Sequence, residues 1–223
     1  MRISIIIPVL NEETTIGSLL GALDDSGADE LLVADGGSVD RTVEIASCHA
    51  RVVRTSTGRA VQMNAAAQSA TGDVLLFLHA DVRLGAAALD VVRKVMADGS
   101  FVGGNFDIRY DGKDWAATAF TQINRWRRRC GIFYGDSGIF CRRSVFDSLG
   151  GFVSWPILED YEFARRLRRV GKLAYLTEPI WVSDRRWRTN GLLATMASWF
   201  FIQSLYYAGV PPKHLARLYR HIR

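Results

Sequence analysis

The stretch "GDVLLFLHADVR", Gly72 to Arg83, decides the fold. Its central residues, Val74 to Leu78, are apolar without interruption, which is typical of a strand that is buried on both faces of a parallel sheet. The run ends in His79, Ala80 and Asp81, so an acid follows the strand directly. Asp81 is therefore either a turn residue or a metal ligand that the strand positions.

Upstream of this stretch, apolar runs of strand type alternate with segments of helical spacing. We expect strands at Ile3–Val9, Glu30–Ala34, Arg51–Thr55 and Asp73–His79. We expect helices between them at Asn11–Leu23, Val39–Cys48 and Arg59–Ala70. This alternation predicts the α/β class, with a mostly parallel central sheet and helices on both faces.

Each predicted strand is followed by polar or glycine-rich residues, and the carboxyl ends of parallel strands share one edge where ligands bind. One such acid alone is more often a turn residue or a helix cap. Four successive strand ends of this kind favour a ligand site at that edge. The residues concerned are Asn11, Glu12, Asp35, Gly58, Arg59, His79 and Asp81.

The second half of the chain is less regular. A strand is expected at Phe101–Tyr110, where Gly103 and Gly104 permit close backbone approach. A helix is expected at Asp114–Arg129, and "YGDSGIFCRR" reads as a glycine-rich loop that leads into a strand. No linker or repeat separates the halves, so we expect one domain over residues 1–223.

Composition and charge restrict the class of protein. The chain has 223 residues, 48% of them hydrophobic, and a net charge of +5 with basic clusters in its second half. Such clusters suit a nucleotide phosphate, a lipid head group or nucleic acid, and solvated helix faces explain them equally well. Three cysteines in no metal or disulfide spacing favour a reducing compartment. The N-terminus lacks the pattern of a signal peptide, and we expect a cytoplasmic protein.

Four motifs occur in a fixed order: "SIIIPVLNEE", "VADGGSVDRT", "GRAVQMNAAAQSATGDVLLFLHADV" and "ILEDYEFARRL". Together they resemble the family 2 glycosyltransferases of GT-A fold, over Met1 to Trp187. Within that family the chain is most similar to the short bacterial selenodomain-associated transferases. The resemblance implies a donor-nucleotide-binding half over 1–100, an acceptor and catalytic half over 101–190 and a helical tail over 191–223.

The resemblance assigns the donor nucleotide to the strand ends. It implies contacts of Pro8, Asn11 and Glu12 with base and ribose, and Asp35 as the acid that reads the base. A carboxylate suits that role because a pyrimidine ring N–H and ribose hydroxyls are donors. Gly58 and Arg59 match the loop beneath the nucleotide, where an arginine pairs well with phosphate. A uridine diphosphate sugar is the first expectation for the donor, and a guanosine diphosphate sugar the next.

The family's metal motif, Asp-x-Asp, is altered here. Asp81 matches its last acid, which implies a Mn²⁺ or Mg²⁺ ion under the donor phosphates, where the metal assists departure of the diphosphate. His79 stands where the first acid is usual. It can contact ribose, ligate manganese or stack.

The "LED" motif implies the catalytic acids. Asp160 matches the general base of an inverting transfer, and Glu159 is its neighbour. Two acids in the first turn of a helix are also explained by the helix dipole alone. Further on, "SDRRW" matches part of a motif of processive relatives. It implies that Arg186 stabilises the leaving pyrophosphate and that the Trp187 ring forms the floor of the acceptor subsite. Ser183 replaces the usual glutamine, which argues against processive synthesis.

Acceptor contacts are expected from Gly103, Gly104 and Asp136. The sequence does not identify the sugar or the acceptor, which can be a sugar, a lipid-linked molecule or a small molecule; no nucleic acid partner is expected. The tail Gly191–Val210 is aromatic and precedes the basic segment Lys213–Arg223. A helix on an anionic membrane surface, a helix packed on the domain and a homodimer contact all fit it.

Rival functions remain open. A sugar-nucleotide-binding module without catalysis fits the altered metal motif. A nucleotidyltransferase or an NAD-dependent oxidoreductase would require a glycine-rich loop after the first strand, and "PVLNEE" is not such a loop.

Overall fold

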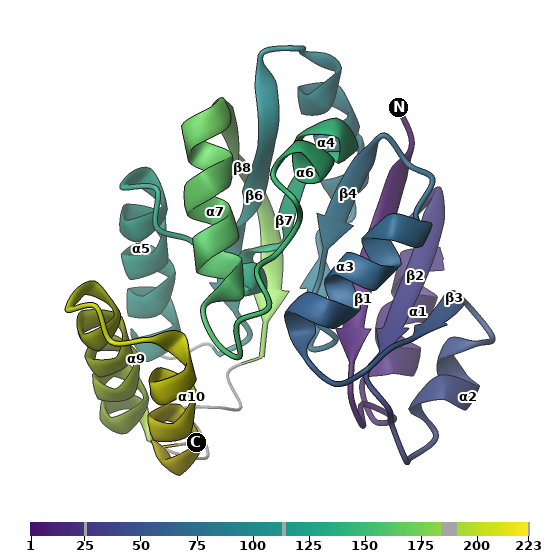
Figure 1. Cartoon of the computed structure of the whole chain (residues 1–223). Coiled ribbons are helices and arrows are strands. Elements are labelled where there is room, and N and C mark those ends of the chain that lie inside the picture. Colours follow the sequence, from purple (N-terminus) through teal and green to yellow (C-terminus); the bar gives the residue numbers. More distant parts are fainter. Residues whose placement is uncertain (25, 113–114, 184–190, 223) are drawn as a thin grey trace.

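One eight-stranded sheet organises the molecule in the computed structural model, which describes residues 1–24, 26–112, 115–183 and 191–222. The strand order is β3-β2-β1-β4-β7-β6-β8-β5 (Figure 1). The strands are β1 (Ile3–Val9), β2 (Glu30–Asp35), β3 (Arg51–Arg54), β4 (Val74–Phe77), β5 (Val82–Leu84), β6 (Phe101–Tyr110), β7 (Ile139–Arg142) and β8 (Lys172–Val182).

Two strands run against the rest of the sheet. β1 pairs in parallel with β2 and β4, β2 with β3, and β6 with β8. β7 lies antiparallel between β4 and β6, and β5 is antiparallel to β8. The predicted α/β fold with a mostly parallel sheet is therefore confirmed.

Helices cover both faces, as predicted. They are α1 (Ile16–Asp24), α2 (Thr42–Ala46), α3 (Arg59–Ser69), α4 (Ala88–Ala97), α5 (Trp115–Arg129), α6 (Arg143–Ser148), α7 (Glu159–Val170), α9 (Leu192–Tyr207) and α10 (Pro212–Ile222), with a short 3₁₀ turn, η1 (Gly135–Ser137). Apolar residues of α1, α4 and α5 form one core with the sheet. Those of α3, α6 and α7 form the core on the other face. Burial of these two apolar layers is the main stabilising term of such a fold.

The structure differs from the predicted elements where loop chemistry overrides apolar spacing. The first helix begins at Ile16 instead of Asn11, because Asn11 adopts a left-handed conformation (φ 56°) that a helix does not accommodate. The tail over 191–223, for which helical structure was expected, contains the two helices α9 and α10. Among the described residues, no helix has the length and apolar character required to cross a membrane.

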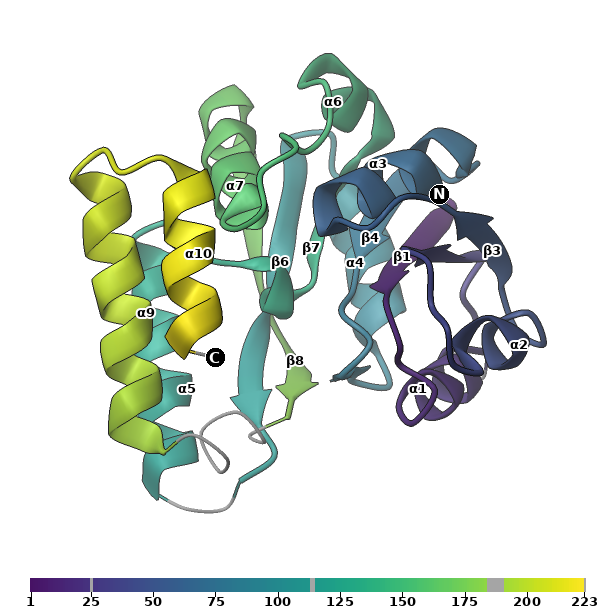
Figure 2. The same cartoon turned by 60° about the horizontal axis from the view of Figure 1, so that its bottom comes forward.

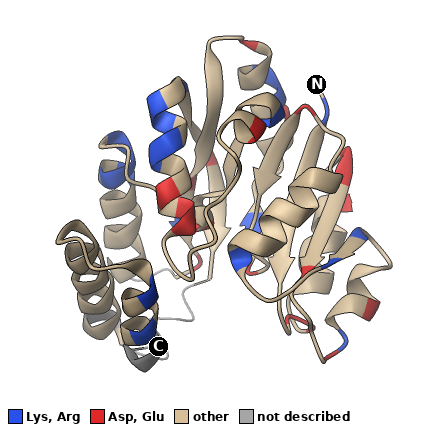
Figure 3. Cartoon of the chain, viewed as in Figure 1, with Lys and Arg blue, Asp and Glu red and all other residues tan. Residues whose placement is uncertain are grey.

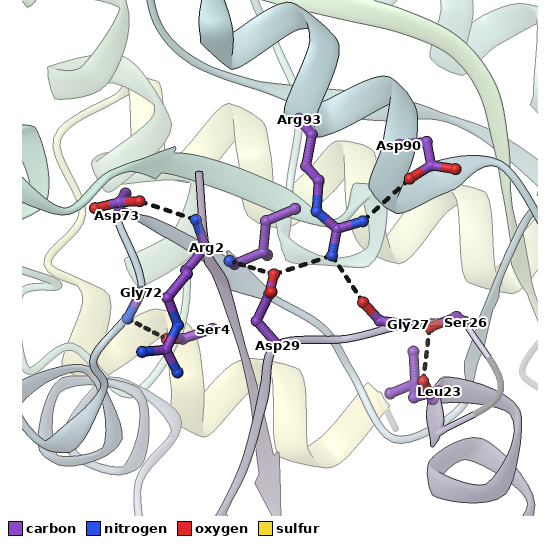
Figure 4. Close-up of polar contacts among 11 residues, drawn as sticks. Arg2, Ser4, Leu23, Ser26, Gly27, Asp29, Gly72, Asp73, Asp90 and Arg93 are labelled. Atoms are coloured by element: carbon purple, nitrogen blue, oxygen red, sulfur yellow. Dashed lines mark hydrogen bonds and ion pairs between the residues drawn. The ribbon is translucent and has the colours of Figure 1, made fainter.

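The sheet edge at the amino ends of β1 and β4 is closed by a polar network (Figure 4). Asp29 accepts the Ile3 N–H at 3.0 Å and pairs with Arg93 at 2.9 Å. Asp73 accepts the Arg2 N–H at 2.8 Å. The carboxylates here are used in tying strand ends together, which leaves the opposite edge, at the carboxyl ends, as the place for a ligand.

Candidate active site

The turns after β1 and β2 are bonded to each other at the carboxyl-end edge of the sheet. The Asn11 N–H donates to Ser38 Oγ at 2.9 Å, and Asn11 Oδ1 accepts the Val39 N–H at 2.9 Å. The Glu12 N–H donates to Thr42 Oγ1 at 2.7 Å. These bonds make the two turns one surface, and Asn11 and Glu12, both assigned to the nucleotide by sequence, lie together on it.

Asp35 ends β2 and is buried, at 3% exposure. Its carboxylate accepts the Gly37 N–H at 3.1 Å and the Ser38 N–H at 3.1 Å. A carboxylate has about four acceptor positions, so these bonds orient Asp35 without exhausting it. Asp40 accepts the Thr42 N–H at 3.0 Å at the start of α2.

A buried glutamine that sequence reasoning missed joins these strands to α3. Gln62, 3% exposed, donates to the Val9 carbonyl at 2.7 Å and to the Ala34 carbonyl at 2.8 Å. Its amide therefore fixes the first turns of α3 against the carboxyl ends of β1 and β2. A polar residue within the Ala-rich predicted helix was the available signal.

The basic start of α3 faces the acidic first turn of α7 (Figure 3). Arg59 Nε lies 2.7 Å from Glu159 Oε1, and the Glu159 side chain is only 1% exposed. Burial raises the pKa of Glu159, and the negative charge of the neighbouring Asp160 raises it further. The positive charge of Arg59 lowers this pKa, but the net direction is upward. Gly58, with φ at 137°, is the residue from which α3 starts.

Asp160 is the second acid and has a different environment. Asp160 Oδ2 accepts the Gly135 N–H at 2.8 Å, and Oδ1 accepts the Tyr161 N–H at 2.7 Å. A Cβ on Gly135 would lie 2.8 Å from His79 Nε2 and 3.0 Å from Asp160 Oδ2. His79 and Asp160 therefore border the same space beside Gly135, and a side chain at position 135 would have to displace them.

Leu158, directly before the acids, adopts a left-handed conformation with φ at 63°. Such a backbone state costs a branched residue on the order of 1–3 kcal/mol and persists only where packing holds it. Leu158 is 8% exposed and belongs to a cluster with Tyr161, Ile202 and Leu215. The last two residues come from α9 and α10, so the tail helices hold the turn from which the acids project.

Tyrosines extend the contact between the tail and the site. The Tyr134 hydroxyl donates to Gln203 Oε1 at 2.5 Å, and the Tyr134 ring stacks on Tyr161 with centroids 5.4 Å apart. The Tyr161 and Tyr207 hydroxyls are hydrogen-bonded to each other. Tyr134 precedes Gly135, and Tyr161 follows Asp160, so α9 contacts both neighbours of the Gly135–Asp160 hydrogen bond.

Asp81 is exposed in the turn between β4 and β5. The described residues contain no group of three or more His, Cys, Asp or Glu side chains that would hold a metal by themselves. Mg²⁺ and Mn²⁺ accept carboxylate oxygen and are commonly bound through one or two carboxylates plus substrate phosphates. An exposed carboxylate two residues after His79 fits that mode of binding.

The remaining predicted site residues are distributed unevenly. Asp136 lies in η1 beside Gly135, and Pro8 is buried in β1. Gly103 and Gly104 lie inside the sheet, where a Cβ would meet the Phe140 carbonyl oxygen at 2.4 Å and the Ala174 carbonyl oxygen at 2.1 Å respectively. The prediction that these two glycines contact the acceptor is therefore not supported, because they lie within β6 and not at the carboxyl-end edge of the sheet. Arg186 and Trp187 lie outside the described residues.

Sequence comparison identifies relatives of the chain. The pattern of the family described as Glycosyl transferase family 2 matches residues 4–150. A PGL/p-HBAD biosynthesis glycosyltransferase of Mycobacterium tuberculosis is 31% identical over 178 residues, which cover 72% of this chain and 67% of that protein. A glucosyl-3-phosphoglycerate synthase of the same species is 36% identical over 95 residues, which cover 36% of this chain and 29% of that protein.

Solved structures share the fold. Staphylococcus aureus TarS 1-349 in complex with UDP-GlcNAc has a TM-score of 0.69 at 18% identity, covering 82% of this chain and 59% of that one. The M. tuberculosis glucosyl-3-phosphoglycerate synthase in complex with Mn²⁺, UDP and glucosyl-3-phosphoglycerate has a TM-score of 0.62 at 21% identity, covering 80% and 70%. The chain thus spans about 60 to 70% of the length of these structures.

Proposed function

We propose that this chain, which belongs to glycosyl transferase family 2, moves a sugar from a nucleotide-sugar donor to an acceptor hydroxyl with inversion at the anomeric carbon. The observation that carries this function is the placement of Asp160. Its carboxylate is held by the Gly135 N–H at 2.8 Å, beside His79 and at the same sheet edge as the predicted nucleotide residues.

The nucleotide side of the site suits a uridine diphosphate sugar. Asn11 and Glu12 belong to a surface formed by two hydrogen-bonded turns, and Asp35 stands at its base. The solved relatives in complex with UDP-GlcNAc and with UDP and Mn²⁺ support uridine diphosphate as the first choice. A guanosine diphosphate sugar is the second choice to test.

Asp81 would hold a Mn²⁺ or Mg²⁺ ion together with the donor diphosphate. When bound, the ion supplies charge stabilisation to the departing diphosphate. His79 borders the space next to Asp160. Arg59 lies next to Glu159 and adds a positive charge on the donor side. Arg186 and Trp187 stay predictions for the leaving group and the acceptor.

Asp160 is the proposed general base. In the reaction the acceptor hydroxyl oxygen bonds to the anomeric carbon from the face opposite the diphosphate. The hydroxyl proton passes to Asp160, and the bond to the diphosphate oxygen breaks. The Gly135 N–H orients the carboxylate for this transfer. Glu159 is the weaker choice because it is 1% exposed and already pairs with Arg59.

The acceptor is a hydroxyl compound of unassigned class, and Asp136, beside Gly135, is its proposed contact. The replacement of the processive motif's glutamine by Ser183 supports transfer of single sugars. Membership of the selenodomain-associated group and a single domain over 1–223 stay predictions.

The test compares Asp160→Asn with Glu159→Gln. Removal of a general base costs about 10²–10⁴-fold in rate, so Asp160→Asn should lose transfer while its affinity for uridine diphosphate with manganese stays at the wild-type value. Glu159→Gln, which keeps the side-chain size, should lose less. Transfer at the wild-type rate by Asp160→Asn would overturn the assignment. Normal donor binding without any transfer in the wild-type protein would favour the binding-module alternative.

A further inference from the structure

The outward face of α9 is apolar although it is exposed. The helix contains no charged residue from Leu192 to Tyr207. Phe200 is 77% exposed and Phe201 49%. A groove of about 600 Å³, open to solvent, lies along this face and is lined by Ala194, Ala197, Ser198, Phe200, Phe201 and Ser204. Exposed apolar surface of this extent usually marks an interaction site.

Two polar residues of the same helix are buried. Thr195 and Ser198 are buried at 3% and 8% exposure. Their hydroxyls donate to the carbonyls of Gly191 and Thr195, at 2.9 and 2.8 Å. Gln203 accepts the Tyr134 hydroxyl. Ile202 and Trp199 also pack inward, so α9 carries apolar residues on both sides. A surface helix in water instead confines its apolar stripe to the side that faces the core. The outward face of α9 is therefore built for apolar surroundings.

The helices next to α9 carry exposed basic residues. α5 lies beside α9 (Figure 2), and Phe120 packs on Trp199 with ring centroids 5.7 Å apart. Of the four arginines of α5, Arg125 and Arg128 pair with Asp107 and Arg127 donates to the Tyr134 hydroxyl, while Arg129 is exposed. Residues 191–223 contain lysine and arginine but no aspartate or glutamate. Lys213 and Arg217 are exposed on α10.

We propose that the outward face of α9 docks on an anionic lipid surface. Phe200 and Phe201 enter the boundary of the acyl chains, and the basic residues of the neighbouring helices lie at the head-group level. Apolar insertion combined with basic residues is the established physical basis of such surface binding. A second copy is the less suitable occupant, because a two-fold contact through α9 would bring two cationic surfaces together.

This docking concerns a surface apart from the catalytic edge and does not depend on the proposed reaction. The experiment therefore uses the full chain without substrate. Sedimentation with phosphatidylcholine vesicles that contain phosphatidylglycerol is compared with sedimentation with phosphatidylcholine alone, at low salt. We expect binding to the anionic vesicles and a decrease as salt is added.

The decisive variant is Phe200→Ser with Phe201→Ser. Because both rings are exposed, the fold should be unaffected, while vesicle binding should fall by about tenfold or more through the lost apolar insertion. Val170→Ser is the control, since Val170 is 51% exposed but lies at the end of α7. It should bind vesicles as the wild-type chain does.

Three results would overturn the proposal. Binding by the double variant at the wild-type level would show that α9 does not insert. Equal binding to neutral vesicles would remove the role of charge. A lack of vesicle binding, with a dimer in solution that the double variant dissociates, would assign the face to a second copy.

Discussion

The nucleotide side and the acid side of the site are built in different ways. On the nucleotide side, Asp35 ends β2 and Asn11 lies two residues after β1. The two strands pair in register with Val9 beside Asp35, so the sheet itself brings these residues together. On the acid side, Asp160 is held by a backbone N–H 25 residues away, and Leu158 is packed by Ile202 and Leu215 from the tail. The first side depends on strand pairing and the second on packing between helices.

This difference separates the expected effects of mutations. Changes on the nucleotide side should act on donor affinity. Changes on the acid side should act on turnover at saturating donor, because they move a reacting group without touching the nucleotide. The four predictions below test that separation in order of decreasing effect.

Asp81→Asn should have the largest effect. Loss of the proposed metal ligand removes several kcal/mol of charge stabilisation, on the order of 10³-fold in transfer rate. Titration of uridine diphosphate with and without manganese should show that the metal-dependent part of nucleotide affinity disappears. Asp90→Asn is the control, because Asp90 is exposed on α4, which starts near the other end of β1. Unchanged metal-dependent affinity in Asp81→Asn would remove Asp81 from the metal site.

Gly135→Ala should break the acid side alone. The added methyl group would lie within 3.0 Å of both His79 Nε2 and Asp160 Oδ2, so the carboxylate must shift. A displacement of this order costs about 10²-fold in rate. Gly99→Ala is the matched control, since a Cβ there meets nothing within 4 Å. A loss of donor affinity with unchanged turnover in Gly135→Ala would contradict the separation between the nucleotide side and the acid side.

Leu215→Ala tests whether the tail holds the acids. Leu215 is fully buried, and a Leu→Ala change in a core costs about 2–5 kcal/mol in the free energy of unfolding. Weaker docking of α10 on Leu158 should lower turnover by about tenfold and leave the affinity for uridine diphosphate unchanged. Leu218 lies on the same helix and is 40% exposed, so Leu218→Ala should change neither the free energy of unfolding nor the turnover. Equal turnover of the two variants under conditions where both are folded would show that the tail does not position Asp160.

The smallest effect concerns the Arg59–Glu159 pair and the pH dependence of stability. The folded state raises the pKa of Glu159 above its ordinary value of 4.5. The native protein thus retains a proton that the unfolded chain releases, and stability falls as pH rises above 4.5. We expect the unfolding temperature of the wild-type protein to fall between pH 4 and 8. The fall should be smaller in Glu159→Gln, and it should be larger in Arg59→Met, which lacks the positive charge opposite Glu159. Identical pH profiles in all three proteins would contradict a raised pKa of Glu159 in the folded state.

Local sequence patterns predicted much of the observed fold. The apolar runs at Ile3–Val9 and Val74–Leu78 predicted two central strands, and the alternation with helices predicted the sheet and the edge where Asn11, Asp35 and His79 meet. The "LED" motif located the acids at the start of a helix, as observed for α7. The predicted glycosyltransferase family is confirmed.

Other features have no local signal. β8 (Lys172–Val182), which lies between β6 and β5, was not predicted because its apolar residues are interrupted by Glu178 and Pro179. Pro179 is tolerated there because it stands at a register irregularity opposite Asp107. Nothing in "YGDSG" shows that Gly135 lies against His79 and Asp160.

The sequence by itself determined the α/β class, the family and the edge of the sheet for which we propose the chemistry, because strand and helix periodicity and residue type are properties of short segments. Only the tertiary structure decided which acid pairs with Arg59, which acid faces His79, and which face of α9 is left exposed. The physical reason is that these outcomes depend on packing between residues far apart in the chain. Tail residues Ile202 and Leu215 belong to the same buried cluster as Leu158, which is in the left-handed state, and no property of residues 156–160 alone specifies that contact.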